Sequence, residues 1–144
     1  LKPDYTKKMI PHFEMNPNVM VFSLFPGIQA NIFGHVLDAP ELKGVVMRSF
    51  GSGNAPQQPW LMRLLKDASE RGVTIVNISQ CGAGFVEMSR YDNGYQLKDT
   101  GVISGHDCTV EAAVTKLMYL HGQYEDTNIV RELMSKSLAG EISI

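Results

Sequence analysis

Polar and glycine residues follow two apolar segments of the chain, and their types suit the binding of a small ligand. Arg48, Ser49, Gly53 and Asn54 come directly after one segment, and Cys81 follows another. A guanidinium suits a carboxylate, glycines let backbone N–H groups approach a ligand, and an amide both donates and accepts hydrogen bonds. Arg48, Gly51, Gly53 and Asn54 therefore suit an amino-acid-like ligand at this rim. Ordinary strand-to-helix turns share this composition, so a purely structural role is the alternative.

The motifs of common nucleotide-binding and hydrolytic sites do not occur in the sequence. A dinucleotide fingerprint would need a third glycine where Pro56 stands, and a phosphate loop would need a Lys-Ser or Lys-Thr pair. No Gly-x-Ser-x-Gly elbow and no His-Glu-x-x-His pair is present either. We therefore interpret the chain as catalytically incomplete.

Two groups of residues with reactive or metal-binding side chains are interpreted as structural. No histidine is placed by the sequence to activate Cys81 as a nucleophile, so we expect a buried or packing thiol there. His106, Asp107 and Cys108 are adjacent, and loop residues before a helix more often cap or pack than bind metal. We accordingly expect no metal site.

The ligand-type residues belong to an alternation of strands and helices. Apolar segments near 19–24, 44–47 and 73–78 have strand character, and helical spacing of apolar residues follows at 28–37 and 60–68. Such an alternation favours a parallel sheet covered on both faces. We predict a small three-layer α/β domain with a mainly parallel sheet of about four strands, flavodoxin-like or Rossmann-like. Ligands of such sheets bind beyond the carboxyl ends of the strands.

The second half of the chain is predicted to be irregular at first and then helical. Residues 81–105 are rich in glycine, and Asn93-Gly94 indicates a turn. Thr109 is a predicted N-cap of a helix that Gly122 ends. A last helix is expected over residues 127–138, closed by Gly140.

Size, charge and cysteine usage limit the class of protein. A chain of 144 residues suits one domain, with residues 1–17 as an interdomain linker or approach segment and 18–144 as the domain. The net charge of -2, with scattered basic residues, argues against nucleic acid and membrane surfaces as partners. Two isolated cysteines, no signal peptide and no membrane span predict a cytoplasmic protein. Because the chain begins with Leu1, we expect a segment of a longer polypeptide.

Several motifs, in order, resemble the second domain of bacterial-type, type I cytoplasmic L-asparaginases. The segments that carry this resemblance are 25–28 (Phe-Pro-Gly-Ile), 48–57 (Arg-Ser-Phe-Gly-Ser-Gly-Asn-Ala-Pro-Gln), 76–81 (Val-Asn-Ile-Ser-Gln-Cys), 91–97 and 101–112. The resemblance extends from about Asn18 to the end of the chain. Phe50, His106 and Cys108 depart from the residues that the family pattern would favour.

The resemblance implies hydrolysis of L-asparagine to L-aspartate and ammonia by a threonine nucleophile, without a metal or organic cofactor. In this family the nucleophile segment Thr-Gly-Gly-Thr lies in an amino-terminal domain, and this chain has no counterpart. Thr109 and Thr115 do not replace it. The active site forms between subunits, so the resemblance implies that Tyr91 supports a neighbouring protomer's site and that the protein is a homodimer or homotetramer.

Some type I members also bind asparagine at an effector site. The residues that resemble that site are Arg48, Ser49, Gly53, Asn54 and Cys81, which agrees with the reading of residue types at the strand ends. Arg48 would hold the effector carboxylate, and Asn54 with backbone groups its other end. Pro56 stands where related periplasmic enzymes have an active-site asparagine, so a catalytic role is not transferred to Asn54 or Glu87.

Two other classes of protein remain as alternatives. One is a stand-alone module that binds an amino acid or drives oligomerisation. The other is the asparaginase-like subunit of a tRNA-dependent amidotransferase. A preceding segment with Thr-Gly-Gly-Thr would favour the asparaginase, and an additional RNA-binding extension would favour the amidotransferase.

Overall fold

The computed structural model of the chain describes residues 6, 8–88 and 92–143. Strands and helices alternate along this part of the chain. In order they are β1 (Val19–Ser23), α1 (Ala30–Leu37), β2 (Gly44–Ser49), α2 (Pro59–Glu70), β3 (Thr74–Ser79), α3 (Asp92–Asp99), β4 (Ile103–Ser104), α4 (Val110–Gln123) and α5 (Thr127–Met134). No helix among the described residues is long and apolar enough to cross a membrane.

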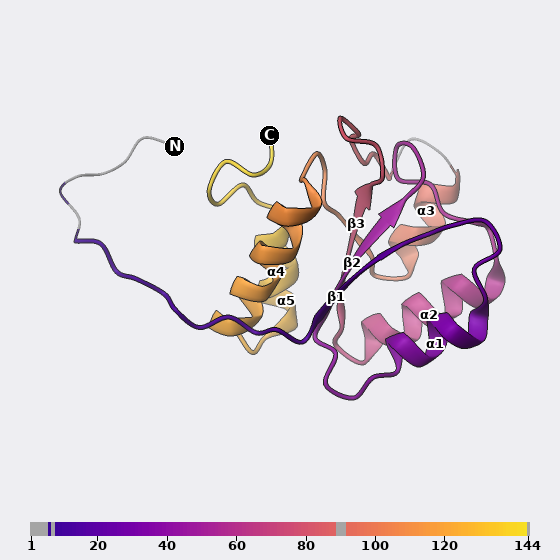
Figure 1. The fold of residues 1–144 in the computed structure, drawn as a ribbon, viewed down its shortest axis with the longest axis horizontal. Coiled ribbons are helices and arrows are strands. Elements are labelled where there is room, and N and C mark those ends of the chain that lie inside the picture. The colour runs from indigo at the N-terminus through magenta and orange to yellow at the C-terminus, as the bar shows by residue number, and fades with distance from the viewer. Residues whose placement is uncertain (1–5, 7, 89–91, 144) are drawn as a thin grey trace.

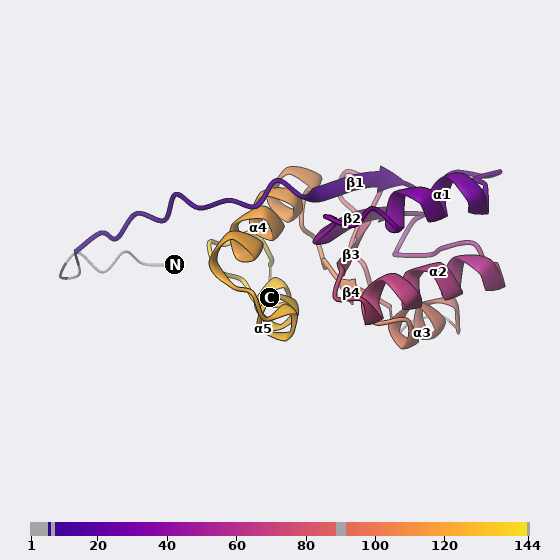
Figure 2. The same ribbon diagram turned by 90° about the horizontal axis from the view of Figure 1, so that it is seen from below.

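The four strands form one parallel sheet between two layers of helices. Their order is β1-β2-β3-β4, and all three pairings are parallel. Helices α1, α2 and α3 cover one face, and α4 and α5 cover the other (Figures 1 and 2). The predicted three-layer α/β domain with about four parallel strands is confirmed. Among the described strands, the sequential order has no reversal of the kind that marks flavodoxin and Rossmann sheets.

The hydrophobic core lies on both faces of the sheet because the central strands are buried on both sides. In β2, Val45 and Met47 belong to the cluster under α1, α2 and α3, whereas Val46 belongs to the cluster under α4 and α5. This alternation is the period of two that a strand imposes. Gly44 lets α4 approach the sheet, since a Cβ at that position would lie 2.6 Å from Leu117 Cδ2.

The described part of the amino-terminal segment, residues 8–17, forms neither helix nor strand and extends away from the domain (Figure 1). Its inner part docks on α4, where Asn16 N donates to Met118 O at 2.9 Å. The predicted end of this helix at Gly122 is wrong, because α4 continues through Gln123. Gly122 instead makes room for the docked segment: a Cβ there would lie 2.3 Å from Glu14 O.

Two other predictions about local structure are wrong. Asn93-Gly94 does not form a turn between short segments but lies inside α3. Leu97 of this helix is fully buried in the core, so tertiary packing overrides the weak local helix signal. The last helix ends at Met134 rather than near 138, and Gly140 lies outside it with a φ of 89°.

A buried lysine caps the end of α5 at Met134. The Lys116 ammonium donates to Met134 O at 3.1 Å and to Lys136 O just beyond the helix, so it satisfies carbonyl groups at this helix end. It also pairs with Glu141 at 2.7 Å, and the two side chains are only 6% and 12% exposed. Burial alone would raise the pKa of Glu141. Hydrogen bonds from Leu138 N, the Lys116 ammonium and Ala139 N outweigh it and lower this pKa to about 2.

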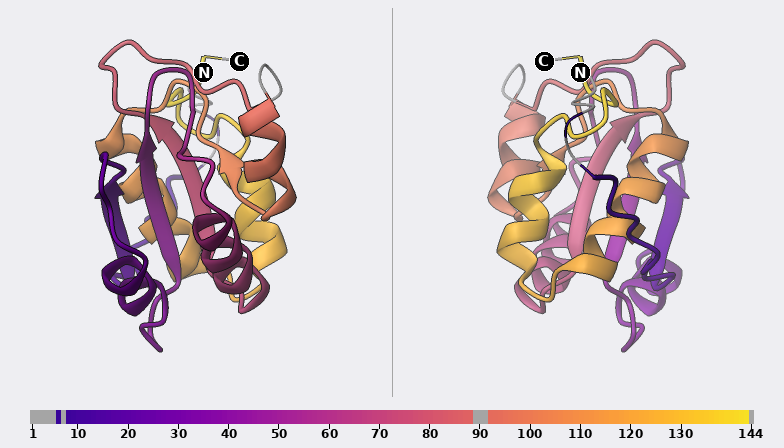
Figure 3. Two further views of the ribbon diagram at one scale, coloured as in Figure 1. Left: turned by 90° about the vertical axis from the view of Figure 1, so that its right-hand side faces the viewer. Right: turned by 90° about the vertical axis from the view of Figure 1, so that its left-hand side faces the viewer.

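Strand and helix ends otherwise follow the sequence signals. Thr109 caps α4 by accepting a hydrogen bond from Ala112 N at 3.2 Å, as predicted. Gly72 follows α2 with a φ of 95°, the left-handed conformation expected of a glycine that ends a helix. Because β2 and β3 run parallel, the loops that follow them start at one end of the sheet (Figure 3).

Gln80 ties the downstream ends of three strands together. Its side-chain amide donates to Leu24 O at 2.7 Å and to Arg48 O at 2.9 Å. Its backbone N donates to Ser49 O at 2.9 Å, and Leu24 N donates to Arg48 O at the same distance. The backbones that carry the ligand-type residues are thus held by one side chain.

Replacing Gln80 should destabilise the domain. Gln80→Met keeps the side-chain size but leaves Leu24 O without its donor, so we expect a loss of about 1–3 kcal/mol in the free energy of unfolding. Urea unfolding followed by circular dichroism measures it. The control is Gln29→Met, because the Gln29 amide donates only to Gly27 O in an exposed turn, and we expect about 0.5 kcal/mol or less. Equal stability of the two variants would contradict the role of Gln80.

Replacing Glu141 should remove an acid-sensitive part of the stability. Its folded pKa of about 2 lies below the ordinary 4.5, so the stabilisation is complete above pH 4.5 and is lost as the pH falls toward 2. Glu141→Gln leaves the buried Lys116 ammonium facing a neutral partner, and we expect a loss of about 3 kcal/mol at pH 7 that shrinks across this window.

Urea unfolding at several pH values compares this variant with Glu132→Gln. Glu132 pairs with Lys136 on the surface, so its replacement should cost less than about 1 kcal/mol. If Glu141→Gln were no less stable than Glu132→Gln at pH 7, or kept the full acid dependence of the unmodified protein, the role of the buried pair would be wrong.

Candidate functional site

A small cavity lies at the end of the sheet where β2 and β3 finish. Its volume is about 250 Å³. Its walls come from the end of β2, the loop after β3, and the loop and first turn of α4. The lining residues are Arg48, Ser79, Gln80, Cys81, Gly82, Gly84, Asp107, Cys108, Thr109, Val110 and Glu111. Segments about 60 residues apart in the sequence therefore meet at one hollow.

Arg48 brings a positive charge to this cavity without a fixed partner for it. Its Nη1 donates to Ser23 Oγ at 3.4 Å, and its Nε is buried without a hydrogen-bond partner in the part of the chain that the structure describes. Among the same residues, Arg48 forms no ion pair. The guanidinium retains donors for a ligand, as the sequence predicted for a carboxylate-binding arginine.

The turn around Cys81, which follows the end of β3, forms part of the cavity wall. Ser79 Oγ donates to Gly51 O at 2.6 Å and accepts from Cys81 N at 3.0 Å. Gly84 fits only without a side chain, since a Cβ there would lie 2.0 Å from Ser79 Oγ. The expectation of a buried or packing thiol is wrong for Cys81, which is exposed. The turn that Ser79 holds directs this residue outward, away from the core.

Three of the predicted ligand residues do not line this cavity. Ser49 is fully buried, and its Oγ donates to Ile78 O at 3.3 Å. Gly53 O accepts a hydrogen bond from Asn77 Nδ2 at 3.0 Å, and a Cβ on Gly53 would lie 2.7 Å from Val86. Asn54 pairs with Phe50 through both backbone groups. The structure thus brings together Arg48 and Cys81 at this cavity, with Ser49 buried at the end of β2 and Gly53 and Asn54 in the turn that follows it.

Two acidic residues of the cavity were not recognised from the sequence as ligand residues. Asp107 and Glu111 flank the start of α4. Ser143 hydrogen-bonds to Asp107 and lowers its pKa, so this carboxylate is ionised at neutral pH. The sequence offered only a capping signal around Thr109, because nothing local relates Asp107 to Arg48.

The His106-Asp107-Cys108 run divides among different surroundings. His106 faces another hollow beside Phe85, and Cys108 is buried with its Sγ donating to Glu141 O at 3.2 Å. Burial raises the pKa of the Cys108 thiol. No group of three or more potential metal ligands occurs among the described residues. Cys108 thus packs in the core, as interpreted, whereas Asp107 lines the Arg48 cavity.

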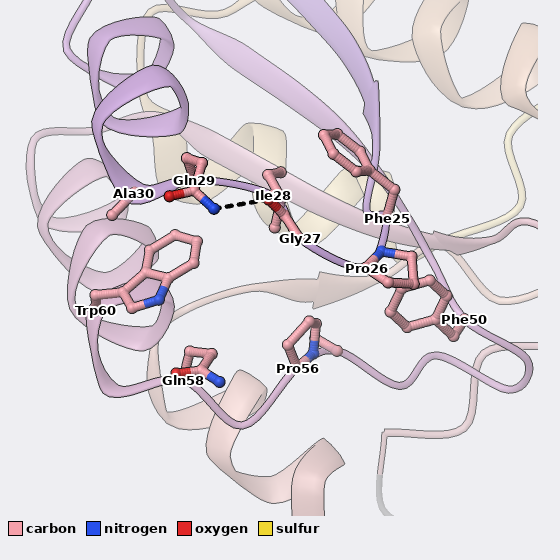
Figure 4. Close-up of a pocket in the computed structure, with 11 residues that line it drawn as sticks. Phe25, Pro26, Gly27, Ile28, Gln29, Ala30, Phe50, Pro56, Gln58 and Trp60 are labelled. Carbon is pink, nitrogen blue, oxygen red and sulfur yellow. Dashed lines mark hydrogen bonds between the residues drawn. The ribbon is translucent and has the colours of Figure 1, made fainter.

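A larger recess of about 770 Å³ lies beside the ends of β1 and β2. Phe50 and Pro26 lie on one side of it and Trp60 and Ala30 on the other (Figure 4). None of the described residues that line it is charged. A free amino acid would leave both of its charges unpaired there, so the smaller cavity beside Arg48 is the better candidate for such a ligand.

Tyr91, the residue expected to support a neighbouring active site, lies outside the described residues. Its role stays a prediction.

The chain is similar in sequence to proteins that carry different functional names. L-asparaginase 1 of Escherichia coli K12 is 44% identical over 123 residues, 85% of this chain and 36% of that protein. The 60 kDa lysophospholipase of Mus musculus is 42% identical over 94% of this chain and 24% of that protein. A subunit of the glutamyl-tRNA(Gln) amidotransferase of Methanobrevibacter smithii is 35% identical over 96% and 32%, respectively. The chain thus spans about a third or less of these relatives.

Solved structures and a family model agree with this relationship. The crystal structure of L-asparaginase I from Vibrio cholerae matches 90% of this chain and 39% of its own, with 43% identity and a TM-score of 0.85. The thermostable L-asparaginase from Thermococcus kodakarensis matches the same shares with 32% identity and a TM-score of 0.83. The model of the glutaminase/asparaginase C-terminal domain matches residues 18–134. With most of its length matched, this chain belongs to the glutaminase/asparaginase C-terminal domain family.

Proposed function

We propose that this chain is the carboxy-terminal domain of an L-asparaginase that hydrolyses L-asparagine to L-aspartate and ammonia. The observation that carries the proposal is the family match over residues 18–134, together with 44% identity to L-asparaginase 1 of Escherichia coli. In this proposal residues 1–17 link the domain to the rest of a longer polypeptide, which supplies the threonine nucleophile. No metal or organic cofactor takes part.

The domain's contribution is structural and regulatory. We assign to it the completion of an active site between subunits of a homodimer or homotetramer, with Tyr91 as the supporting residue. The side chains of Met9, Ile10 and Phe13 are 83%, 72% and 84% exposed. Apolar side chains exposed to this extent often mark a contact surface, and such an assembly would cover them.

The protein is proposed to be cytoplasmic. The unpaired thiols Cys81 and Cys108 fit a reducing compartment of this kind.

The Arg48 cavity is the proposed effector site for asparagine. Arg48 would bind the ligand carboxylate, and Cys81 with its turn would form the facing wall. Ser49 would support the site from the end of β2, and Gly53 and Asn54 from the turn that follows, where Asn77 holds Gly53.

An asparaginase-like component of a tRNA-dependent amidotransferase is the second candidate. The relationship to the Methanobrevibacter smithii protein favours it over an unrelated module. The two candidates differ in their product, because the amidotransferase would deliver ammonia to a charged tRNA rather than release it. A stand-alone amino-acid-binding or oligomerisation module is the third candidate, and such a module would release no ammonia.

Ammonia release separates these functions. We expect no ammonia from L-asparagine with the 144-residue chain alone, because the threonine nucleophile lies elsewhere, and steady release with the full-length polypeptide. Coupled glutamate dehydrogenase measures both. Turnover by the chain alone would overturn the assignment of the chemistry to another domain, and an inactive full-length protein would remove the asparaginase proposal.

Arg48 can be tested by the shape of the kinetics. In the full-length protein, Arg48→Ala should convert a sigmoidal dependence of rate on asparagine concentration into a hyperbolic one, because the effector loses its carboxylate partner. The matched control is Arg63→Ala, an exposed arginine of α2 that does not line the cavity, which should leave the curve sigmoidal. Sigmoidal kinetics that persist in Arg48→Ala would contradict the effector role.

A further inference from the structure

The segment before β1 is bound to the domain on both sides of Pro17. Asn18 O accepts a hydrogen bond from Lys43 N at 2.8 Å, just before β2 begins. Asn16 N donates to Met118 O of α4 at 2.9 Å. The segment then passes the carboxyl end of α4 before it extends away from the domain (Figure 1). It is thus held to the start of β2 and to α4, which lie far apart in the sequence.

One side chain of α4 holds the residues of this segment that lie further from β1. Gln123, the last residue of α4, donates from Nε2 to Glu14 O at 2.9 Å. Its Oε1 lies 3.0 Å from His12 Nδ1, and because an amide oxygen can only accept, the imidazole is the donor. The His12 ring also packs edge-on against Tyr119, with 6.1 Å between the ring centroids. Contacts with α4 therefore continue as far as His12.

A glycine in α4 lets the segment run directly over the helix backbone. A Cβ on Gly122 would lie 2.7 Å from Glu14 C and 3.0 Å from Met15 Cα, and both are backbone atoms that cannot rotate away. In an α-helix a carbonyl points toward the residue four positions later, so Met118 O lies beside Gly122. The missing side chain leaves this carbonyl accessible to Asn16 N. Gly122 thus forms a seat for the backbone of the segment.

The helix itself gains nothing from a glycine at this position. Glycine destabilises a helix interior relative to alanine, because it loses more backbone freedom on folding. Gly122 does not end α4 either, since the helix continues through Gln123. The close approach of the segment is therefore the feature of the structure that requires glycine here.

We propose that residues 12–18 are a fixed arm of this domain and not a flexible tether. Gly122 and Gln123 are then positioning residues, because they set the direction in which the preceding polypeptide leaves the domain. The inference rests on the proposed function, in which that polypeptide carries the threonine nucleophile.

A fixed arm does more for such an enzyme than a tether. A flexible tether sets only the effective concentration at which two domains meet. A fixed arm also sets their relative orientation, and an active site that this domain completes in a neighbouring subunit depends on that orientation. The seat on α4 would therefore contribute to catalysis without touching the substrate.

Hydrogen exchange of the 144-residue chain, followed by NMR, tests the fixed arm. In the unmodified chain we expect the Asn16 amide to exchange about tenfold or more slowly than in a peptide of residues 8–18, because its hydrogen bond to α4 must open before exchange. Equal rates in the chain and in the peptide would overturn the proposal.

Variants of the same chain identify what holds the arm. Gly122→Ala places a Cβ against the backbone of the segment, and Gln123→Ala removes the side chain that holds it. Each should accelerate exchange of the Asn16 amide about fivefold or more, and Gly122→Ala should fold because alanine favours a helix. The matched control is Gly34→Ala in α1, where a Cβ would lie 3.5 Å from Leu64, an ordinary contact. Unchanged exchange in both α4 variants would contradict the seat.

Kinetics of the full-length polypeptide test the positioning role. Gly122→Ala should lower kcat for L-asparagine about tenfold, because a small misplacement of the completing domain weakens catalysis. KM should stay within about twofold, since the proposed function places the nucleophile and its substrate contacts in the other domain. The thermal midpoint of unfolding should not fall, whereas a merely stabilising contact would lower it. Gly34→Ala should leave kcat unchanged.

The positioning role is overturned if Gly122→Ala frees the Asn16 amide but keeps full kcat, or if kcat falls only together with the thermal midpoint. A full-length protein that releases no ammonia would instead remove the asparaginase assignment. Exchange on the 144-residue chain would still decide whether the arm is fixed, so the two failures remain distinguishable.

Discussion

A parallel sheet that is covered on both faces is the constraint on which the rest of this structure depends. Parallel strands point the same way, so every strand ends at one edge and every following loop begins there. This places Arg48 and Cys81 at the same edge. The second face must also be covered, and α4 does so by starting directly after β4 at that edge. Because α4 begins at this edge, Asp107 just before it and Glu111 in its first turn line the cavity.

Polar contacts then connect the stability of the domain to the shape of the cavity. Lys116 and Glu141 form a buried pair that holds the carboxy-terminal segment against α4. The same segment supplies the contacts of Cys108 and Asp107, through Glu141 O and Ser143 N. The part of the cavity wall around Asp107 and Cys108 is consequently held by the carboxy-terminal segment, which the buried Lys116–Glu141 pair stabilises. The part of the wall at the strand ends depends in the same way on Gln80, which joins the ends of β1, β2 and β3.

Membership of the family establishes the type of domain, whereas the charges in the cavity are what support an amino acid as its proposed ligand. Relatives of similar identity carry the names of an asparaginase, a lysophospholipase and a component of an amidotransferase, so one fold serves proteins with different names. The large recess beside Trp60 is uncharged and the small cavity carries both signs of charge. Electrostatic complementarity rather than size favours the small cavity for an amino acid.

Local patterns in the sequence determined three of the four described strands, most helices and the residues at the ends of these strands. Apolar runs indicated β1, β2 and β3, and Arg48 at the end of β2 was recognised as a carboxylate-binding arginine because its type alone suggests that chemistry. Tertiary structure decided the remainder. Leu97 makes α3 a helix through core packing, Lys116 caps the end of α5, and the turn held by Ser79 exposes Cys81.

The charges of the cavity show the same division. Asp107 and Glu111 join Arg48 only when β4 and α4 bring them to the same edge, about 60 residues further along the chain. Hydrophobic periodicity in the sequence indicates which residues of one helix or strand are buried. Which charged residues of different elements lie close together depends on how those elements pack. The sequence by itself therefore determined three strands, most helices and the arginine, and only the tertiary structure decided which carboxylates share its cavity.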